Sequence, residues 1–384
     1  MKNVRKAMNQ KLGWIGLFLA LLMVCGIVLP SYLKAESPGK AVGAATHPVL
    51  IPVLCYHRII PNGPSVYDFS PAQLEQHFQY LKEHGYHPIT ALQMLQAEHD
   101  PARLPARPVV LTFDDGHRSH YTTVFPLLKK YGYQATFFVI AGSVATRSEN
   151  AITWAELEEM AQAGMDIECH SMTHPFLTDR RAAGGTEHYR KWLEHEIRDS
   201  KLLIEEKLHR PVRLLAYPYG WFNQTVEEVA LQAGYQGMHT VFWGNNESGD
   251  SPLRIKRRVM ENSYDLAKLE RILTIRPLHL QIYGPADAAI VTQIPAIRFK
   301  LSIQDRGQGS GQAQGVKDIE LQVRNYRVSL EPDGQGVYTF QPPELKPGYC
   351  MITVKGSDAA GNLYETSWGF DYRKHDPADA QRGL

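Results

Sequence analysis

Between residues 49 and 241, short apolar runs alternate with amphipathic segments. The runs of strand length are VLIPVLCYH, RPVVLTF, ATFFVI, MDIECH, RLLAYPYG and GMHTV. Between them, apolar residues recur at helical spacing, as Leu74, Phe78 and Leu81 do. Strands that alternate with amphipathic helices predict parallel β-strands with helices packed outside them, in an open α/β sheet or a barrel.

Two of the expected helices begin with a recognisable N-terminal signal. The segments 70–73 (SPAQ) and 153–156 (TWAE) both have the spacing of a capping box, and the proline suits the first helical position. Gly85 and Gly164 are expected to end these two helices. Further helices are expected over 121–131, 189–208 and 224–233.

After about Pro285 the hydrophobic period changes to two. Apolar and polar residues alternate, and Asp-Gly, Gly-Gln and Gly-Asn turns separate the segments. This pattern predicts a small antiparallel β-sandwich over 295–376. The stretch 356–362 resembles the closing hairpin of bacterial Ig-like surface modules. The chain is therefore expected to hold an α/β domain over 48–284 and an Ig-like β domain after it.

The N-terminus has the pattern of a targeting segment. Four basic residues precede an uncharged apolar run over 12–30, as in a secretory signal peptide or a signal anchor. We assign residues 1–31 to this segment, either cleaved or kept as a membrane anchor. Residues 32–47, rich in Ser, Pro, Gly and Ala, are assigned to a linker. The protein is expected outside the cell or on its surface, with an N-terminal segment able to associate with the membrane.

Composition narrows the possible partners only slightly. The chain has 384 residues, 43% of them hydrophobic, and a formal net charge of +1 at pH 7. A nucleic-acid-binding protein usually carries a basic excess on one face, so we expect no nucleic-acid partner for this chain. The 4 cysteines are too few and too far apart for a disulfide framework. Cys55 and Cys169 lie in strand-like runs and are expected to be small buried side chains.

Candidate metal ligands follow two of the expected strands. Asp114 and Asp115 end the run VVLTFDDG, where two adjacent carboxylates are either solvated or share a cation. His170 and His174 are four residues apart, a spacing that puts both imidazoles on one face of a helical turn. Two imidazoles and one carboxylate form a three-ligand site for Zn²⁺, which activates water at neutral pH and polarises a carbonyl. The second aspartate could then accept a proton. Each motif alone also fits a solvated strand end or a chance histidine pair.

Three motifs together resemble those of a known family. TFDDG (112–116), HSMTH (170–174) and YPYG (217–220) are similar to the motifs of the polysaccharide deacetylases of carbohydrate esterase family 4, the NodB-homology domain. The resemblance covers roughly 48–260 and implies a distorted (β/α) barrel. It implies Asp114 as the base and a metal ion, Zn²⁺ or another divalent ion such as Co²⁺ or Ni²⁺. The implied metal ligands are Asp115, His170 and His174, and the implied oxyanion and substrate contacts are the N–H of Tyr219 and the neighbouring Tyr217.

The sequence departs from the common family pattern in two places. Ala216 stands where many members have an arginine that fixes the catalytic aspartate, and Arg258 is the candidate replacement. The strand that usually carries the general acid is not evident around His279. The run PVLCYHRI instead places His57 at the end of the first strand. This arrangement is similar to the poly-β-1,6-N-acetylglucosamine N-deacetylases, and it implies that His57 is the general acid. A core or helix-capping histidine is the alternative.

The expected function is a metal-dependent hydrolase that removes N-acetyl groups from an N-acetylglucosamine-containing polysaccharide. Poly-β-1,6-N-acetylglucosamine is the favoured substrate, and peptidoglycan or chitin oligomers are the alternatives within enzymes. A non-catalytic glycan-binding surface protein is the alternative from another class. The intact Asp-Asp-His-His set favours the enzyme, whereas Ala216 favours the surface protein.

Overall fold

The computed structural model describes residues 48–97, 100–180, 184–302 and 315–374. The predicted signal (1–31) and the predicted linker (32–47) precede these ranges, so both lie outside the described residues. Among the described residues, we find no helix that is both long and apolar enough to cross a membrane.

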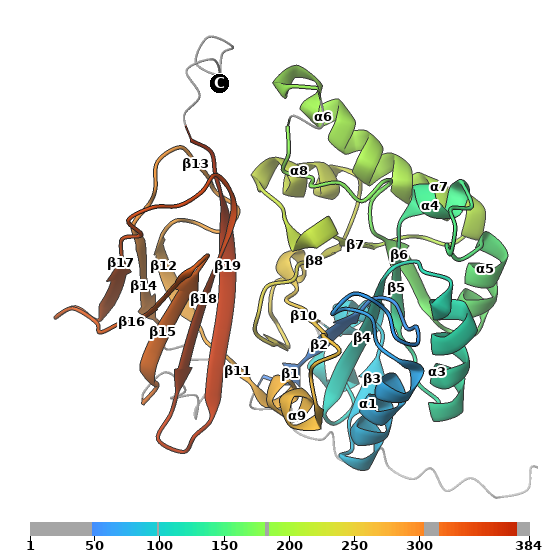
Figure 1. Cartoon of the computed structure of the whole chain (residues 1–384), viewed down its shortest axis with the longest axis horizontal. Coiled ribbons are helices and arrows are strands. Elements are labelled where there is room, and N and C mark those ends of the chain that lie inside the picture. Colours follow the sequence, from blue (N-terminus) through green and yellow to red (C-terminus); the bar gives the residue numbers. More distant parts are fainter. Residues whose placement is uncertain (1–47, 98–99, 181–183, 303–314, 375–384) are drawn as a thin grey trace, which may run out of the picture. The chain divides into compact units, whose positions relative to one another are not determined.

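A parallel half-barrel sheet carries the predicted motifs (Figure 1). Its strands run in the order β10-β2-β4-β5-β6-β7-β8, with β3 paired to β4, and every pair is parallel. The bounds are β2 (Val53–Tyr56), β3 (His87–Ile89), β4 (Pro108–Asp115), β5 (Thr136–Val139), β6 (Asp166–Cys169), β7 (Leu214–Ala216), β8 (Gly237–His239) and β10 (Arg258–Val259). A single bridge between His239 and Ile255 extends the sheet from β8 towards the segment that leads into β10. The predicted α/β architecture is confirmed.

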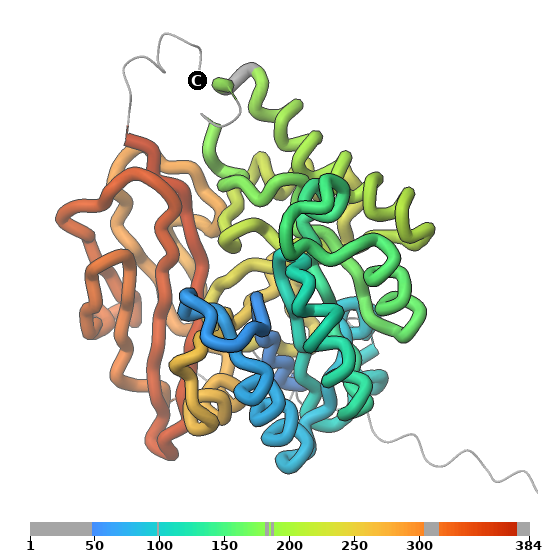
Figure 2. The backbone as a smooth tube through the Cα atoms, turned by 45° about the vertical axis from the view of Figure 1, so that its right-hand side comes forward, coloured from blue at the N-terminus to red at the C-terminus, as the bar shows by residue number. Residues whose placement is uncertain are grey.

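Helices pack on both faces of this sheet: Leu74 and Leu128 lie in one apolar core, and Met94 lies in the core on the opposite face. The two predicted capping boxes are confirmed. The helices are α1 (Pro71–Glu83), α2 (Ala91–Gln96), α3 (Phe125–Tyr131), α4 (Ala141–Ala145), α5 (Trp154–Gln162), α6 (Thr186–Glu194), α7 (Ser200–Leu208), α8 (Gln224–Gln232) and α9 (Leu266–Thr274). The expected helix over 189–208 is interrupted by a π-helical segment, His195–Asp199. Figure 2 shows α9 beside α1, two helices far apart in sequence that also contact each other.

Residues of β4 alternate between two apolar cores. Leu111 and Phe113 belong to the large core that the sheet shares with the helices. Val110 belongs to a smaller core that also contains Phe138 and Ala216 from neighbouring strands. Because side chains alternate along a strand, this register places Asp114 on the same face as Val110.

The remaining strands form further sheets. A six-stranded sheet contains β11 (Arg276–Pro277), β13 (Ile290–Val291), β15 (Lys317–Val323), β16 (Tyr326–Ser329), β18 (Gly348–Ser357) and β19 (Leu363–Tyr372). A three-stranded sheet contains β12 (Leu280–Gly284), β14 (Ile297–Leu301) and β17 (Val337–Phe340), and β1 (Leu50–Ile51) pairs with β9 (Asn246–Glu247). Since β11 and β13 pair with β19, the chain enters the six-stranded sheet before residue 295, the predicted start of the β domain.

Side chains connect β18 and β19 to the half-barrel region. Tyr349 on β18 is part of the large core. Arg258 at the start of β10 forms a buried ion pair with Glu365 on β19. These contacts give the C-terminal strands a structural connection to the strand next to β2.

Candidate active site

The predicted site residues lie at the carboxyl ends of neighbouring strands. His57 follows β2, Asp114 and Asp115 end β4, and His170 follows β6. The carboxyl ends of parallel strands share one edge of a sheet, and this edge is where α/β proteins place their active sites. The strand order therefore brings together residues that are more than 100 positions apart in the sequence.

Asp115, His170 and His174 form a compact group of possible metal ligands. The Nε2 atoms of His170 and His174 each lie 3.6 Å from Oδ1 of Asp115. Ligands placed about 2.1 Å from one tetrahedral ion are about 3.4 Å from each other, so this spacing suits Zn²⁺ or an ion of similar size. Oδ1 of Asp115 is buried and has no hydrogen-bond partner among the described residues. The three side chains fit a divalent ion.

The orientation of His170 suits a metal ligand. Its Nδ1 lies 2.8 Å from the carbonyl oxygen of Ala216, which acts as an acceptor, so the proton sits on Nδ1 and the Nε2 lone pair faces Asp115. Burial lowers the pKa of His170 to about 4. The imidazole is therefore neutral at pH 7, as metal binding requires. Ala216, where the family pattern has an arginine, thus orients His170 through its backbone.

Left-handed backbone, and not a helical turn, brings the ligands together. Asp115, Ser171 and His174 have φ values of 77°, 66° and 61°. The expectation that His170 and His174 share a helical face is therefore wrong, because the segment after β6 is a loop. The Oγ of Ser171 accepts a hydrogen bond of 2.9 Å from the N–H of His174 and stabilises this loop. Non-glycine residues rarely adopt such values, and they cluster at functional sites.

Arg257 is the cation beside Asp114, and the prediction of Arg258 is wrong. Arg257 donates from Nη1 to Oδ1 and from Nη2 to Oδ2 of Asp114, at 2.7 and 2.8 Å. Arg258 pairs instead with Glu365. Burial by itself would raise the pKa of Asp114, but its neighbours, of which the Arg257 guanidinium acts most strongly, together hold this pKa well below its ordinary value. Asp114 is thus an ionised acceptor at neutral pH.

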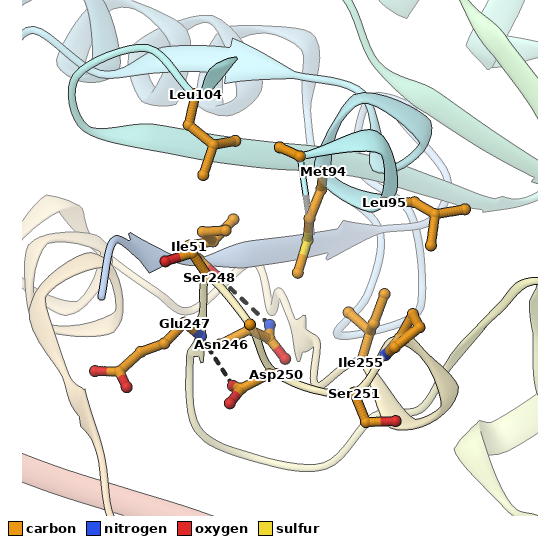
Figure 3. A pocket seen from close by; sticks show the side chains of 13 residues that line it. Ile51, Met94, Leu95, Leu104, Asn246, Glu247, Ser248, Asp250, Ser251 and Ile255 are labelled. Atoms are coloured by element: carbon orange, nitrogen blue, oxygen red, sulfur yellow. Dashed lines mark hydrogen bonds between the residues drawn. The ribbon is translucent and has the colours of Figure 1, made fainter. Parts of the chain in front are cut away.

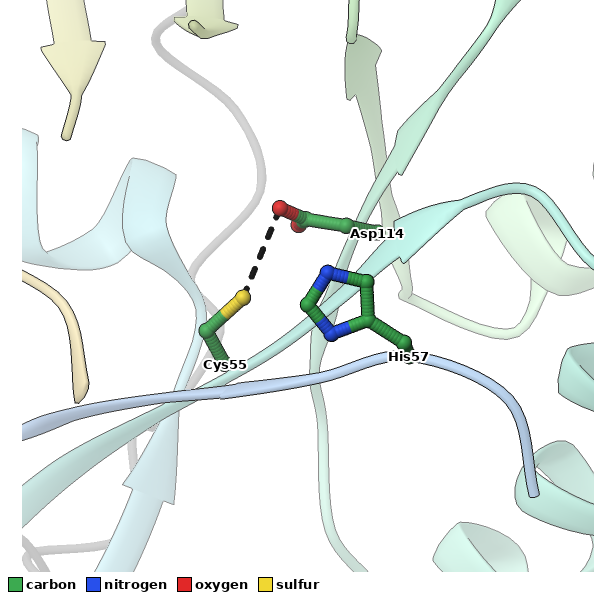
Figure 4. Close-up of side chains that lie close together, drawn as sticks. All are labelled: Cys55, His57 and Asp114. Carbon is green, nitrogen blue, oxygen red and sulfur yellow. Dashed lines mark hydrogen bonds between the residues drawn. The ribbon is translucent and has the colours of Figure 1, made fainter. Parts of the chain in front are cut away.

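Cys55 and His57 complete the surroundings of Asp114 (Figure 4). The thiol of Cys55 donates to Oδ2 of Asp114 at 3.4 Å, and burial raises the pKa of this thiol so that it remains a donor. Ligand-type atoms of Cys55, His57 and Asp114 lie within 4.8 Å of one another. The sequence predicted the burial of Cys55 but gave no signal for its contact with Asp114.

The backbone of His57 is fixed by the loop that follows β4. Nε2 of His120 lies 2.8 Å from the carbonyl oxygen of His57, and Oγ of Ser119 accepts from the N–H of Ile59 at 3.0 Å. His120 is fully buried, and burial lowers its pKa to about 4, so it is neutral and donates from Nε2. Sequence analysis missed His120 and Ser119. Their position just after the Asp-Asp-Gly turn was the available signal.

Comparisons with known proteins agree with this geometry. Residues 102–238 match the family model described as "Polysaccharide deacetylase". The chain carries a polysaccharide deacetylase domain. The protein named "Putative polysaccharide deacetylase YxkH" of Bacillus subtilis is 32% identical over 209 residues, which cover 54% of this chain and 66% of that protein.

Two further relatives extend the comparison. The poly-β-1,6-N-acetyl-D-glucosamine N-deacetylase of Escherichia coli K12 is 25% identical over 301 residues, covering 69% of this chain and 43% of that protein. The chain thus spans less than two thirds of the length of these curated relatives. The solved structure of the deacetylase PplD of Streptococcus pyogenes, in complex with acetate, has a TM-score of 0.54 and 27% identity. The aligned region covers 59% of this chain and 99% of the chain of that structure.

Two tyrosines predicted near the substrate occupy different environments in the deacetylase domain. The Tyr217 side chain is fully buried and stacks on Phe222, so it belongs to the core and cannot touch a polymer. Tyr219 is 44% exposed, has a φ of 58°, and its ring centroid lies 4.6 Å from that of His174. Of the two, only Tyr219 lies at the surface of the site.

His279, the alternative general acid, lies at the other end of the sheet. Its Nε2 is 3.2 Å from Oε2 of Glu247, on the short strand β9 that pairs with β1. Since β1 precedes β2 along the chain, this contact lies near the amino ends of the strands. The structure does not bring His279 to the carboxylates of the deacetylase domain.

A small pocket also lies away from the candidate site (Figure 3). Its lining includes Ile51, Leu104 and Ile255, which precede β2, β4 and β10. It holds about 20 Å³, room for roughly one water molecule. The pocket belongs to the amino-terminal side of the sheet and is too small for a sugar.

Proposed function

We propose that this protein is a metal-dependent N-deacetylase that hydrolyses acetamide groups of an N-acetylglucosamine polysaccharide. The observation that carries the proposal is the Asp115-His170-His174 group, placed beside an Asp114 that Arg257 keeps ionised. A ligand set with an adjacent ionised acceptor suits hydrolysis and has no use in a purely glycan-binding protein. The enzyme is therefore favoured over the non-catalytic surface protein.

Asp115, His170 and His174 would hold the ion, for which we propose Zn²⁺. When bound, a divalent ion polarises the substrate carbonyl and lowers the pKa of water. Asp114 accepts the proton of the attacking water, because its carboxylate is ionised and lies 3.7 Å from Nε2 of His170. His57 donates a proton to the departing amine, and the N–H of Tyr219 stabilises the negative charge that develops on the acetyl oxygen.

For the substrate we propose poly-β-1,6-N-acetylglucosamine. The position of His57 after β2, within reach of Asp114, supports this choice, as does the name of the Escherichia coli relative. We also propose that the protein is exported through residues 1–31 and that its C-terminal sheets form an Ig-like β-sandwich. The core that contains Phe299 and Trp368, from the two different sheets, supports the sandwich.

Release of acetate from defined oligomers tests the proposed function. The purified protein should release acetate from β-1,6-linked N-acetylglucosamine oligomers, lose this activity after dialysis against a chelator, and regain it with Zn²⁺. Faster release from β-1,4-linked oligomers would contradict the proposed linkage and favour a chitin or peptidoglycan substrate. Binding of oligomers without any acetate release from the metal-loaded protein would favour the non-catalytic surface protein.

The two aspartates are expected to respond differently to the same substitution. Asp115→Asn should weaken Zn²⁺ binding, because Asp115 supplies the carboxylate of the ligand group. Asp114→Asn should retain Zn²⁺ and lose turnover by about 10² to 10⁴-fold, the usual contribution of a general base. Equilibrium dialysis with elemental analysis measures the metal, and equal loss of metal in both variants would show that the roles are misassigned.

A further inference from the structure

Two exposed groups of aromatic side chains flank the candidate site. Tyr67, on the loop after β2, is 42% exposed, and its ring centroid lies 5.5 Å from that of His57. Phe176 and Tyr219 are 39% and 44% exposed, and Tyr219 packs against His174. Exposed apolar surface next to a functional site often marks a binding surface.

The group beside His174 is a rigid platform. The rings of Phe176 and Tyr219 are stacked, with centroids 3.9 Å apart and planes at 19°. The ring centroid of Trp221 lies 4.7 Å from that of Phe176. Trp221 stacks in turn on the buried ring of Tyr349, with centroids 5.4 Å apart. Since each ring packs on another that is more deeply buried, the two exposed rings are held in place before any ligand binds.

The loop that carries Tyr67 is held equally firmly. Arg58 donates to both carboxylate oxygens of Asp68, each at 2.7 Å, and Asp68 is 3% exposed. Nδ2 of Asn262 donates to the carbonyl oxygens of Ser65 and Asp68 at 3.1 and 3.2 Å. The backbone on both sides of Tyr67 is fixed, while the ring itself faces solvent.

The two groups lie on different sides of the reacting atoms. Tyr67 adjoins His57 after β2, whereas Phe176 follows His174 in the loop after β6. In the sheet, β4 and β5 lie between β2 and β6, and β4 carries Asp114 and Asp115. Three strand spacings amount to about 14 Å, wider than a single sugar ring.

We propose that Tyr67 and the Phe176–Tyr219 pair bind the sugar residues on either side of the one that is deacetylated. This inference rests on the proposed function. A pyranose ring has an apolar face of C–H groups and a rim of hydroxyls, so it stacks on an aromatic ring while its rim stays hydrated. With one subsite on each side, the enzyme acts on the interior of a polymer and disfavours a free monosaccharide.

Substitution of each ring tests the subsites. Tyr67→Ala and Phe176→Ala should each lower kcat/KM for a β-1,6-linked N-acetylglucosamine pentamer by about 3- to 10-fold, the effect of one aromatic contact. N-acetylglucosamine itself occupies only the central position, so its kcat/KM should fall by a smaller factor than that for the pentamer in both variants. Phe176→Trp should restore the value for the pentamer. Tyr283→Ala is the matched control, because Tyr283 is 49% exposed but lies on β12.

Three outcomes would overturn the inference. Equal losses on the pentamer and the monosaccharide would mean that the rings only support the fold of the site. Unchanged kinetics with a change from dimer to monomer in sedimentation would mean that a second copy of the chain covers them. A wild-type protein that releases no acetate from any oligomer would contradict the proposed function itself, and the proposed subsites would then have no basis.

Discussion

Replacing Arg257 with alanine is expected to remove most turnover and to destabilise the protein by about 3 to 5 kcal/mol. The Arg257 guanidinium is fully buried and is the only cation that contacts the Asp114 carboxylate among the described residues. Without it, burial would act on Asp114 with its strongest opposing charge removed, so the pKa of Asp114 should rise towards the protonated form. A protonated carboxyl cannot accept a proton, so kcat should fall by about 10² to 10⁴-fold.

The neighbouring arginine supplies the matched control. Arg258→Ala also removes a buried guanidinium, but from a pair with Glu365. Nζ of Lys355 lies 3.4 Å from Glu365 and remains as a partner, so the loss of stability should be smaller. Urea unfolding measures the stability of both variants, and acetate release per folded molecule measures turnover. Equal loss of turnover in the two variants would contradict a specific role for Arg257.

The same pair predicts a pH dependence. Arg257 holds the pKa of Asp114 below its unfolded value of about 3.9. The stability that this carboxylate contributes is therefore present above that pH, and it is lost as the pH falls through the lowered pKa. In Arg257→Ala the pKa of Asp114 should rise, because the strongest of the charges that lower it is removed, and the acid limb of kcat/KM should move to higher pH. An acid limb in the same place as in the wild type would show that Asp114 is not the group that titrates.

Replacing His57 with glutamine is expected to reduce turnover by about 10² to 10⁴-fold while Zn²⁺ remains bound. Glutamine can still make a hydrogen bond but cannot donate a proton to the departing amine. His57 lies beside Asp114 and outside the Asp115-His170-His174 group, so metal binding should be unaffected. Single-turnover acetate release and elemental analysis measure the two properties separately.

His279→Gln is the control for this variant. His279 pairs with Glu247 near the amino ends of the strands, so its loss should leave kcat nearly unchanged. The opposite result, an inactive His279→Gln protein and an active His57→Gln protein, would contradict the assignment of the general acid. The position of His57 would then no longer support the proposal of a β-1,6-linked substrate.

The sequence by itself determined the order of strands and helices and most of the candidate site. Capping boxes at Ser70 and Thr153 are local signals, since the side chain and the N–H that it accepts from lie three residues apart. The apolar run of β4 predicted a buried parallel strand, since a strand covered on both faces is apolar throughout. In the structure both faces of β4 pack against apolar cores. Placing Asp115 and His170 at strand ends then followed from the rule that parallel strands share one edge.

The tertiary structure alone decided how these residues are turned and which partners they have. Adjacent side chains on a strand point to opposite faces, so one step in register separates Arg257, paired with Asp114, from Arg258, paired with Glu365. That register depends on packing between segments 143 residues apart, which no local pattern encodes. The left-handed backbone at His174 likewise replaces the expected helical turn. The loop is held by Glu196, 23 residues further on, whose carboxylate accepts from the N–H and the hydroxyl of Thr173 at 2.9 and 2.7 Å.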